Sequence, residues 1–327
     1  MRKILAVSGG IDSMILLHIF RNDPTVLVAH FNHGTRPSAD SDEAFVEKTA
    51  KSYGLEFVSS RANLGENASE EAARYIRYEF FSKLCADRSG ELYTAHHARD
   101  LIETIAINLL RGTGWRGLAP FGNSAVKRPF LDPTLLPPVA NRELSADSAK
   151  NLPIDKPAIY RYATTHNLTF REDPTNSDDA YLRNRLRPKV KNLENSASET
   201  ILNLYHDTHN LKLEIDTLSA EILDLLAETP KNPEPAETHK VSETSETSIS
   251  YPRAPFKTLD DKAAEELLRV ALKRANISAT RPQIRDFLAA IHTYSPGKYF
   301  NLPKSRLVKL SKTSFSLYSA DIFPKNP

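Results

Sequence analysis

Strand-like and helix-like segments alternate along the first third of this chain. The predicted strands cover residues 3–7, 25–30, 56–59 and 91–94, and the predicted helices cover residues 12–20, 41–53, 69–88 and 100–110. This rhythm predicts an α/β fold in which a parallel sheet is wrapped by helices. Ligands of such sheets bind at the carboxyl ends of the strands. Polar clusters follow the predicted strands at residues 8–13, 30–36 and 95–100, so these clusters are the first candidates for a functional site.

The composition is that of an ordinary globular protein and excludes several classes. A chain of 327 residues predicts about two domains. It has no apolar stretch of the roughly 20 residues that span a bilayer and no signal peptide, so we expect no membrane segment. Cys85 is the only cysteine, which excludes an internal disulfide and fits a reducing cytoplasm. The net charge of +2 is too small to indicate nucleic-acid binding without local basic patches.

The turn between the first predicted strand and the first predicted helix carries the strongest chemical signal. It reads Ser8-Gly9-Gly10-Ile11-Asp12-Ser13. Such a turn aims several backbone N–H groups at one point beside the positive end of a helix dipole, so all six residues are candidates for binding phosphate. The lysine-bearing G-x-x-x-x-G-K-[ST] loop is absent, and the Asp12 carboxylate fits beside a triphosphate if Mg²⁺ lies between them. The alternative is an ordinary turn with Asp12 or Ser13 as N-cap.

Two further polar clusters follow predicted strands. In the loop of residues 30–36, the side chains of His30, Asn32 and His33 are suited to holding adenine, ribose or a phosphate oxygen. The alternative is a polar loop whose groups satisfy one another. In the second cluster, His97, Asp100 and Glu103 recur every three residues, so they share a helix face and are candidates for binding ATP or Mg²⁺ opposite Asp12. A dedicated zinc site is disfavoured, since no H-E-x-x-H pattern occurs.

Arginines mark two more segments. Arg111 and Gly112 belong to a glycine-rich turn after the helix predicted for residues 100–110. The arginine suits a phosphate or a carboxylate there, whereas the alternative makes Gly112 a helix C′ residue. Arg183 and Arg187 lie on one face of a further helix and could grip a phosphate, although a solvated surface is the common outcome for such charge runs.

The residues of the turn resemble the SGGxDS signature of the PP-loop (N-type) ATP pyrophosphatases. These enzymes split ATP between its α- and β-phosphates and leave an adenylated substrate. A longer set of motifs, in order as far as about Arg187, is similar to one branch of that superfamily, the tRNA(Ile)-lysidine synthetases. The set comprises SGGIDS, the His-Phe-Asn-His-Gly loop, Arg74 with Arg77-Tyr78, Ala95-His96-His97, Asp100 with Glu103-Thr104, Leu110 to Gly114, Arg128 to Leu131, and Arg171-Glu172-Asp173 through Asn176 to Arg183-Asn184-Arg185 and Arg187.

This chain departs from the family pattern in two places. The family usually reads His-His-x-Asp-Asp-Gln, whereas Arg99 and Leu101 stand here at the first aspartate and at the glutamine. Within this motif, the resemblance therefore implies a metal-binding role for Asp100 only. The second departure is a Pro-rich stretch at residues 132–157, which we predict to be a loop inserted beside the site.

The resemblance implies a ligase that joins L-lysine to C2 of the wobble cytidine, position 34, of the isoleucine tRNA with a CAU anticodon. The C2 oxygen attacks the α-phosphate of ATP and releases pyrophosphate, and the amino group of lysine then attacks C2 and expels AMP. ATP and Mg²⁺ are the implied cofactors. The implied roles are catalysis by Asp12, Asp100 and Arg183; Mg²⁺ binding by Asp12 and Asp100; ATP binding by Ser8 to Ser13, His30, Asn32, His33, His97, Arg111 and Gly112; and tRNA binding by Arg74, Arg187, Lys304, Arg306 and Lys309. Glu103, Glu172 and Asp173 are candidates for receiving or deprotonating the lysine.

The second half of the chain begins with a heptad ladder. Its members occupy alternating a and d positions and are Ile201, Leu204, Thr208, Leu211, Ile215, Leu218, Ile222 and Leu225. They predict a long helix with one apolar seam. We favour packing of this seam within the chain, and the alternative is packing against a second copy in a homodimer. Residues 229–252, rich in Glu, Thr, Ser and Pro, predict a disordered linker.

The last segment predicts a small α+β domain. Two helices are expected at residues 259–276 and 281–294, with Thr258 and Thr280 as N-caps. Strands of a hairpin are expected at residues 299–302 and 307–318. Their lysines either protect a sheet edge or, as we favour, contact tRNA phosphates. The predicted organisation is a PP-loop catalytic domain at residues 1–190, a connecting helix at 191–228, a linker at 229–254 and a tRNA-binding domain at 255–327.

Three rival functions use parts of the same sequence. A tRNA thiolase would share the ATP-binding turn but needs catalytic or cluster-binding cysteines, which Cys85 alone cannot supply. An amidotransferase-type synthetase needs ammonia from a glutaminase, and no such domain is recognisable. A nucleotide sensor without catalysis would have no use for the arginines at 183 and 187 or for the basic hairpin.

Overall fold

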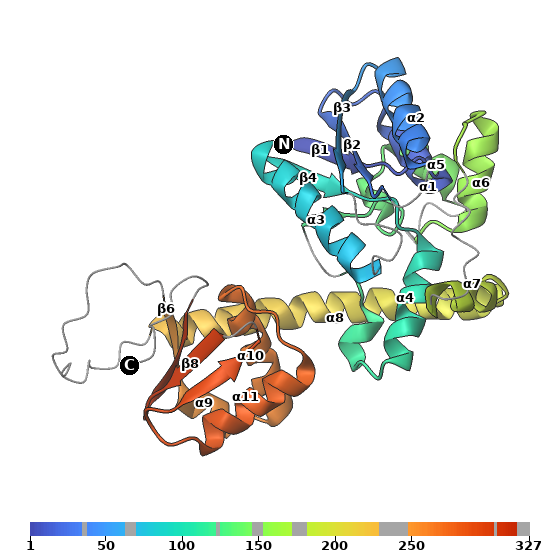
Figure 1. Ribbon diagram of the computed structural model, residues 1–327. Helices are drawn as coiled ribbons and strands as arrows, with labels where there is room; N and C mark the ends of the chain where they lie inside the picture. Colours follow the sequence, from blue (N-terminus) through green and yellow to red (C-terminus); the bar gives the residue numbers. More distant parts are fainter. Residues whose placement is uncertain are drawn as a thin grey trace. The chain divides into compact units, whose positions relative to one another are not determined.

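The computed structural model describes residues 1–34, 38–62, 70–121, 125–145, 153–171, 182–228, 248–303 and 306–318 (Figure 1). The chain divides into two units, Met1–His209 and Asn210–Pro327. Among the described residues, no helix is both long enough and apolar enough to cross a membrane.

The first unit is built on a five-stranded parallel sheet. Its strands are β1 (Arg2–Ala6), β2 (Val26–Asn32), β3 (Glu56–Arg61), β4 (Gly90–Tyr93) and β5 (Val126–Lys127), in the order β3-β2-β1-β4-β5. Ile4 of β1 is paired with Leu27 of β2 on one side and with Leu92 of β4 on the other. The predicted α/β fold with a parallel sheet is therefore confirmed.

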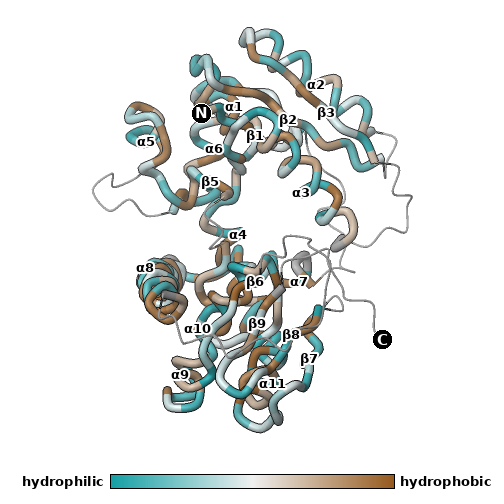
Figure 2. The backbone as a smooth tube through the Cα atoms, turned by 90° about the vertical axis from the view of Figure 1, so that its left-hand side faces the viewer, coloured by the Kyte–Doolittle hydropathy of each residue, from teal (hydrophilic) through white to brown (hydrophobic). Residues whose placement is uncertain are grey.

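Helices cover both faces of this sheet, because alternate strand residues feed two different cores. The helices are α1 (Ile11–Phe20), α2 (Ala39–Ser52), α3 (Glu70–Asp87), α4 (Ala98–Leu110), α5 (Pro138–Leu144), α6 (Lys156–Thr165) and α7 (Leu182–Lys191). Val26 and Val28 pack with α1, α2, α5 and α6, whereas Leu27 and Ala29 pack with α3. Every residue of β2 is buried. The helix α1 is apolar from Met14 to Phe20 apart from His18 (Figure 2).

The Pro-rich stretch at residues 132–157 is not the loop that we predicted. It contains a 3₁₀ turn, η2 (Pro133–Leu135), the helix α5 and the start of α6. Pro133, Pro138 and Pro157 stand in the first turns of these elements, where a missing N–H costs nothing and the fixed φ suits a helix. Asp155 caps α6 by accepting a hydrogen bond from the N–H of Ala158 at 2.8 Å.

Among its described residues, the second unit contains a four-stranded antiparallel sheet, three short helices and the C-terminal part of a long helix described below. The elements are β6 (Ser248–Pro252), α9 (Arg253–Thr258), α10 (Asp261–Arg274), α11 (Arg281–Thr293), β7 (Tyr299–Leu302), β8 (Arg306–Leu310) and β9 (Ser314–Tyr318), with strand order β6-β9-β8-β7. Phe256, Phe287 and Phe315 are fully buried at the centre of its core. The prediction of a small C-terminal α+β region is confirmed.

Local details of this unit correct three predictions. The strand predicted over residues 307–318 is two strands, because Ser311 accepts hydrogen bonds from the N–H groups of Thr313 and Ser314 and so closes a turn. Thr280 is the N-cap of α11 as predicted, but the N-cap of α10 is Asp260 rather than Thr258. The linker predicted for 229–254 ends earlier in the structure, because residues 248–252 form β6. Residues 229–247 lie outside the described part.

Arg253, at the junction of β6 and α9, explains why this stretch is ordered. Its side chain is only 3% exposed and donates to the backbone oxygens of Ile291, Tyr294 and Ser311. A buried guanidinium is stable only when its donors are paired, and these carbonyls provide that pairing. The residue therefore ties α9 to the end of α11 and to the β8–β9 turn.

The long helix predicted from the heptad ladder is present as α8 (Asn195–Glu228). The first part of its seam packs within the chain as we predicted, since Ile201 packs against the core of α4 and α7 and Thr208 is buried. Leu204, Leu211, Leu218, Ile222 and Leu225 are 43–67% exposed. Other faces of α8 also contribute buried residues: Leu202 and Tyr205 in the first unit, and Leu223 in the second.

A polar cluster holds α6 against the C-terminal end of α1. Nδ1 of His18 lies 3.2 Å from the hydroxyl of Tyr162, and His166 pairs with Glu143 at 2.7 Å. The pKa of His18 is lowered from 6.5 to about 4, chiefly because burial disfavours the imidazolium and secondarily because the Arg21 guanidinium repels it. His18 is therefore neutral in the folded protein at neutral pH.

This shift predicts an acid-sensitive fold. The unfolded chain takes up a proton at His18 near pH 6.5 but the folded chain only near pH 4, so the free energy of unfolding falls as the pH drops through that window. We expect a loss from this group of about 2 kcal/mol between pH 7 and pH 5, measured by urea unfolding. His18→Gln should flatten that part of the profile, while His206→Gln, at an exposed site on α8, should not. Equal profiles for His18→Gln and the parent would contradict the assignment.

Candidate functional site

The turn between β1 and α1 has the backbone geometry of an anion site. Gly9 has a φ of +92°, a conformation that side-chain-bearing residues rarely adopt. Gly10 is the N-cap of α1, so no N-cap side chain occupies the first N–H groups of that helix. The hydroxyl of Ser13 donates to the oxygen of Gly10 at 2.9 Å and accepts from the N–H of Ser8 at 3.1 Å. The alternative that made Asp12 or Ser13 the N-cap is therefore wrong.

Asp12, in the first turn of α1, is the meeting point of three helix starts. Its Oδ1 lies 2.5 Å from Nζ of Lys156, the first residue of α6, and 3.6 Å from Nε2 of His97, the N-cap of α4. The N–H of Ala98 donates to the oxygen of Ile154 at 2.9 Å, which fixes the start of α4 against the entry to α6. The positive ends of three helix dipoles therefore converge where an anion would lie on the turn.

His97 and Asp100 form a capping box at the start of α4. The Asp100 carboxylate accepts from the N–H of His97 at 3.1 Å, and Nδ1 of His97 accepts from the N–H of Asp100 at 3.4 Å. The box orients the His97 ring with Nε2 toward Asp12, and the ring is buried. The i, i+3 spacing predicted that these side chains share a face, and the box is the physical reason that they do.

Sequence reasoning gave no role to Lys156. It lies 144 residues from Asp12 in the chain, inside the stretch that we had predicted to be a loop. The N-cap Asp155 and the start of α6 hold it in place, and its ammonium group also lies 5.5 Å from the centre of the Tyr160 ring. An Asp-Lys-Pro start to a helix was the one local signal, but it says nothing about the partner of the lysine.

Arg171 is a second cation beside the turn. Its N–H donates to the oxygen of Gly9 at 2.9 Å, and its guanidinium lies 5.0 Å from the centre of the Phe45 ring. Its Nε is 4.0 Å from Asp42. Sequence analysis named this arginine only as part of a motif. The neighbouring candidates Glu172 and Asp173 lie outside the described residues.

The cluster of residues 30–36 begins inside β2, so His30 and Asn32 are strand residues rather than the loop residues that we predicted, and both are buried at the carboxyl end of the strand. Nδ1 of His30 is 2.8 Å from the oxygen of Val7, at the entrance to the turn. Asn32 donates to Asp40 at 2.9 Å and to Glu43 at 2.8 Å. The ring of His33 packs edge-on against Phe31, with centroids 4.8 Å apart. His30 and Asn32 therefore shape the wall of the site through internal hydrogen bonds.

The described residues contain no group of three or more His, Cys, Asp or Glu side chains that could hold a metal ion by themselves. Mg²⁺ does not require one, because it is commonly held by one or two carboxylates together with substrate phosphates and water. The carboxylate of Asp12 is 31% exposed beside the turn, which fits such a ligand. One oxygen of Asp100 is already used in the capping box, so Asp12 fits a magnesium site better than Asp100 does.

Several predicted residues lie elsewhere. Arg111 and Gly112 are at the opposite end of α4 from His97, about 20 Å along the helix, and are not brought to the turn. Gly112 has a φ of +67°, as a C′ residue has. Nε of Arg187 lies 3.7 Å from the carboxylate of the buried Glu103. Arg183 lies in α7, but its side chain is outside the described part.

The predicted RNA-binding residues are also scattered. In the first unit, the guanidinium of Arg74 on α3 lies 4.8 Å from the centre of the Tyr78 ring. In the second unit, Arg306 donates to the backbone oxygen of Ala275 at 3.0 Å, a contact that caps the end of α10. Lys309 is exposed on β8, paired in register with Tyr299 of β7. Lys304 lies outside the described residues.

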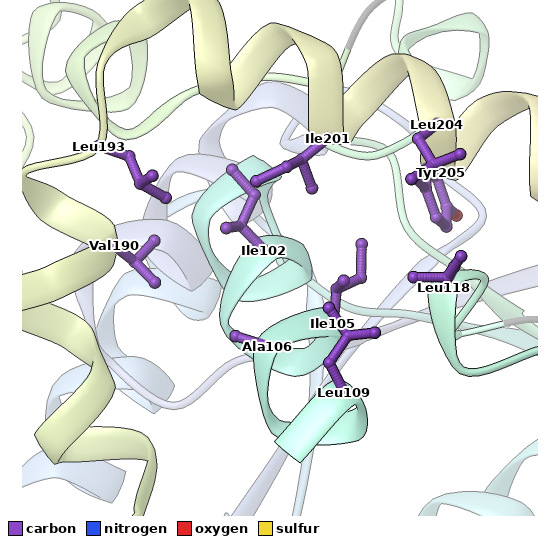
Figure 3. Close-up of a pocket in the computed structure, with 10 residues that line it drawn as sticks. All are labelled: Ile102, Ile105, Ala106, Leu109, Leu118, Val190, Leu193, Ile201, Leu204 and Tyr205. Carbon is purple, nitrogen blue, oxygen red and sulfur yellow. The ribbon is translucent and has the colours of Figure 1, made fainter. Parts of the chain in front are cut away.

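An apolar cavity of about 150 Å³ lies beside α4 (Figure 3). Its walls come from α4, η1 (Trp115–Leu118), α8 and the end of α7, and the lining residues are Ile102, Ile105, Ala106, Leu109, Leu118, Val190, Leu193, Ile201, Leu204 and Tyr205. Apart from the phenol of Tyr205, this set carries no polar side chain, so it offers nothing that binds a phosphate. The polar convergence at Asp12 is the candidate site.

Comparison with known proteins defines the class of protein. Residues 1–194 match the family model of the PP-loop domain, and the chain belongs to that family. It is 36% identical over 208 residues to the "Bifunctional protein TilS/HprT" of Listeria monocytogenes serotype 4b, covering 58% of this chain and 29% of that protein.

Two further relatives are both named tRNA(Ile)-lysidine synthase. The chain is 31% identical over 246 residues to the tRNA(Ile)-lysidine synthase of Persephonella marina, covering 68% of this chain and 50% of that protein. It is 35% identical over 202 residues to the tRNA(Ile)-lysidine synthase of Chlorobaculum tepidum, covering 57% of this chain and 55% of that protein. The matched part of these relatives is about half of their length or less.

Proposed function

We propose that this protein is a tRNA(Ile)-lysidine synthetase acting in the cytoplasm. Its substrates are ATP, L-lysine and the isoleucine tRNA with a CAU anticodon, and its products are lysidine at position 34, AMP and pyrophosphate. The observation that carries the proposal is the convergence of three helix N-termini on Asp12 and Lys156, in a domain similar to proteins named tRNA(Ile)-lysidine synthase.

Adenylation of the base makes C2 electrophilic. The N–H groups of the turn at residues 8–13 hold the phosphates, since the N-cap of α1 is glycine and no N-cap side chain bonds to the first N–H groups of the helix. Asp12, with Asp100 as the second candidate, would hold Mg²⁺, and the ion would supply charge stabilisation at the phosphates. Lys156 and Arg171 add fixed positive charge at the same edge of the sheet, where the C2 oxygen attacks the α-phosphate and pyrophosphate leaves.

The second step needs a neutral amino group on the lysine substrate. Glu103 is the candidate to receive it within the described residues, because it lies in the second turn of α4 after His97 and Asp100. Its carboxylate is 2% exposed and faces Arg187. In this proposal, Arg187 and Arg183 of α7 bind the tRNA phosphates close to the Glu103 carboxylate.

The thiolase alternative is disfavoured by the number of cysteines and also by the environment of Cys85, the single cysteine of the chain. Cys85 lies in α3, and burial together with the nearby Glu91 carboxylate raises the pKa of its thiol. A thiolate is the reactive form, so a raised pKa makes Cys85 a poor nucleophile at neutral pH. Activation of a base for attack by an amine needs no cysteine.

The test is a nucleoside digest of a CAU-anticodon isoleucine tRNA transcript after incubation with the protein, ATP, Mg²⁺ and labelled L-lysine. We expect labelled lysidine and AMP in equal amounts, and pyrophosphate release that requires both ATP and tRNA. The matched control is the same transcript with uridine at position 34. Absence of AMP release and lysine incorporation with the cytidine transcript would reject the function.

The exposed lysine of β8 leads to a prediction about tRNA binding. Lys309→Glu is expected to weaken tRNA binding and to lower the slope of log Kd against log salt by about 1, because one phosphate contact is lost. The control is Lys262→Glu at the start of α10, which makes the same charge change where an acidic residue favours the helix. Filter binding from 50 to 300 mM salt measures both variants. Parallel slopes for Lys309→Glu and the control would remove β8 from the tRNA surface.

A further inference from the structure

An exposed tyrosine on α6 stands beside the candidate site. Tyr160 lies one turn after Lys156 and is 50% exposed. The other tyrosine of this helix, Tyr162, has the opposite environment, because it is 6% exposed and its hydroxyl lies 3.2 Å from Nδ1 of His18. The buried face of α6 consists of Ala158, Ile159, Tyr162 and Ala163. The core therefore uses Tyr162 and leaves Tyr160 at the surface.

The ring of Tyr160 lies close to the Asp12 carboxylate, with Lys156 between them. Nζ of Lys156 is 2.5 Å from Oδ1 of Asp12 and 5.5 Å from the centre of the Tyr160 ring. One ammonium group thus separates the ring from the carboxylate. The direction of the ring has a local cause, since helical side chains lean toward the N-terminus of their helix, and the first residue of α6 is the one that contacts Asp12.

The contact with Lys156 does not by itself account for a ring at this position. A cation–π contact at an exposed site is weak, and the ammonium group is already paired with Asp12. A flat aromatic face beside a cation has a further use, because the ring can stack on a nucleobase while the cation contacts a phosphate. The turn at residues 8–13, where we place the phosphates, is next to this pair.

Two nucleobases take part in the proposed reaction, the adenine of ATP and the cytosine at position 34 of the tRNA. Sites for small molecules are concave and bury most of the ligand, whereas half of Tyr160 is open to solvent. An open aromatic face suits a base that arrives on a polymer, because other contacts along the polymer supply the remaining affinity. Unpaired bases of RNA are commonly bound in this way, by stacking on aromatic side chains.

We propose that Tyr160 is the residue on which the cytosine at position 34 stacks. This inference rests on the proposed function and names the side chain that positions the base. An enzyme that acts on a base takes it out of the stack of its neighbours, and an aromatic side chain replaces the stacking that is lost. Stacking uses only the face of the base, so the C2 oxygen at its edge stays free to attack the α-phosphate. Tyr160 thus positions the base, while Lys156 and the turn act on the phosphates.

A fluorescent base tests this stacking without any turnover. The probe is a CAU-anticodon tRNA transcript with pyrrolocytidine at position 34, whose emission falls when the base is stacked, and ATP is left out. At saturating protein, we expect the same quenched emission with the parent and with Tyr160→Phe, which keeps the ring. Emission should be brighter with Tyr160→Leu, which keeps an apolar side chain but has no aromatic face.

The control for the fluorescence test is Thr164→Ala, at an exposed position one turn further along α6. This variant should give the parental emission, and circular dichroism should show the parental helix content in all three variants, because both positions are exposed. Equal emission from the parent and from Tyr160→Leu would overturn the proposal.

Steady-state kinetics shows which substrate the ring serves. Tyr160→Leu is expected to raise the KM for tRNA about 10- to 100-fold, the effect of losing one stacked base, and to leave the KM for ATP unchanged. Tyr160→Phe should have the parental values. The effect on the KM for tRNA should persist in a Lys156→Met background, because the ring acts on the base directly and not through the lysine.

Two kinetic results would overturn the stacking role. A raised KM for ATP with an unchanged KM for tRNA would assign the ring to adenine. An effect of Tyr160→Leu that disappears in the Lys156→Met background would make the ring a support for the lysine. A parent protein that forms no lysidine would reject the proposed function instead, and the fluorescence comparison would still decide whether the base stacks on Tyr160.

Discussion

An Asp12→Asn variant is expected to release pyrophosphate from ATP at least about 100-fold more slowly than the parent in the presence of tRNA. The reason is the loss of the negative charge that binds Mg²⁺ beside the phosphates, since an amide is a much weaker ligand for a hard cation. Removal of one group that stabilises transition-state charge commonly costs a factor of 10² to 10³. Release of pyrophosphate, measured by a coupled assay, reports the first chemical step directly.

The control for Asp12→Asn is Asp260→Asn. Asp260 is the N-cap of α10 in the second unit, and asparagine caps a helix about as well as aspartate does. This variant should match the parent in both rate and unfolding temperature. Asp12 would be excluded from the mechanism by a folded Asp12→Asn variant with the parental rate.

A Lys156→Met variant is expected to raise the KM for ATP about 10- to 100-fold. Methionine keeps most of the length of the side chain but removes the ammonium group that lies 2.5 Å from Asp12. Hydrogen bonds to charged groups contribute about 1.5–3 kcal/mol, which corresponds to that range. ATP binding by the parent and by Lys156→Met should be measured with and without Mg²⁺, because the ammonium group of Lys156 and Mg²⁺ would both approach the Asp12 carboxylate.

Lys257→Met, at an exposed position on α9, is the control and should leave the KM for ATP unchanged. The double variant Asp12→Asn with Lys156→Met closes a double-mutant cycle. Because the two side chains are in contact, their effects should be non-additive. A KM equal to that of the parent in Lys156→Met would show that the lysine serves only to neutralise Asp12.

The fold was predictable where local pattern and tertiary structure agree. The apolar runs at residues 3–7 and 25–30 became β1 and β2 because both of their faces are covered by helices. The turn at residues 8–13 could be placed between a strand and a helix for the same reason. Thr280 was recognisable as an N-cap because Gln283 stands three residues later and completes the capping box.

The features that sequence analysis missed have two causes. Some segments have a composition that is typical of another structure, and some contacts join residues that are far apart in the chain. Proline at the start of a helix looks like proline in a loop, which concealed α5 and α6 and with them Lys156. Serine and proline at residues 248–252 looked like linker, but pairing with β9 makes them a strand. Arg171 reaches the turn through its backbone N–H, a contact that no side-chain pattern reveals. The position of the turn at residues 8–13 was readable from the sequence, whereas the two cations beside it were not.

The hydrogen bond from Ala98 to Ile154 and the contact of Lys156 with Asp12 have a consequence for how the protein is made. The turn at residues 8–13 is translated among the first residues, but the ammonium group of Lys156 that faces it is made about 140 residues later. A nascent chain released before α6 can form the early strands yet lacks that charge. If the turn binds ATP as proposed, we expect full affinity for ATP only after α6 has been made, and weaker ATP binding by fragments that end before α6.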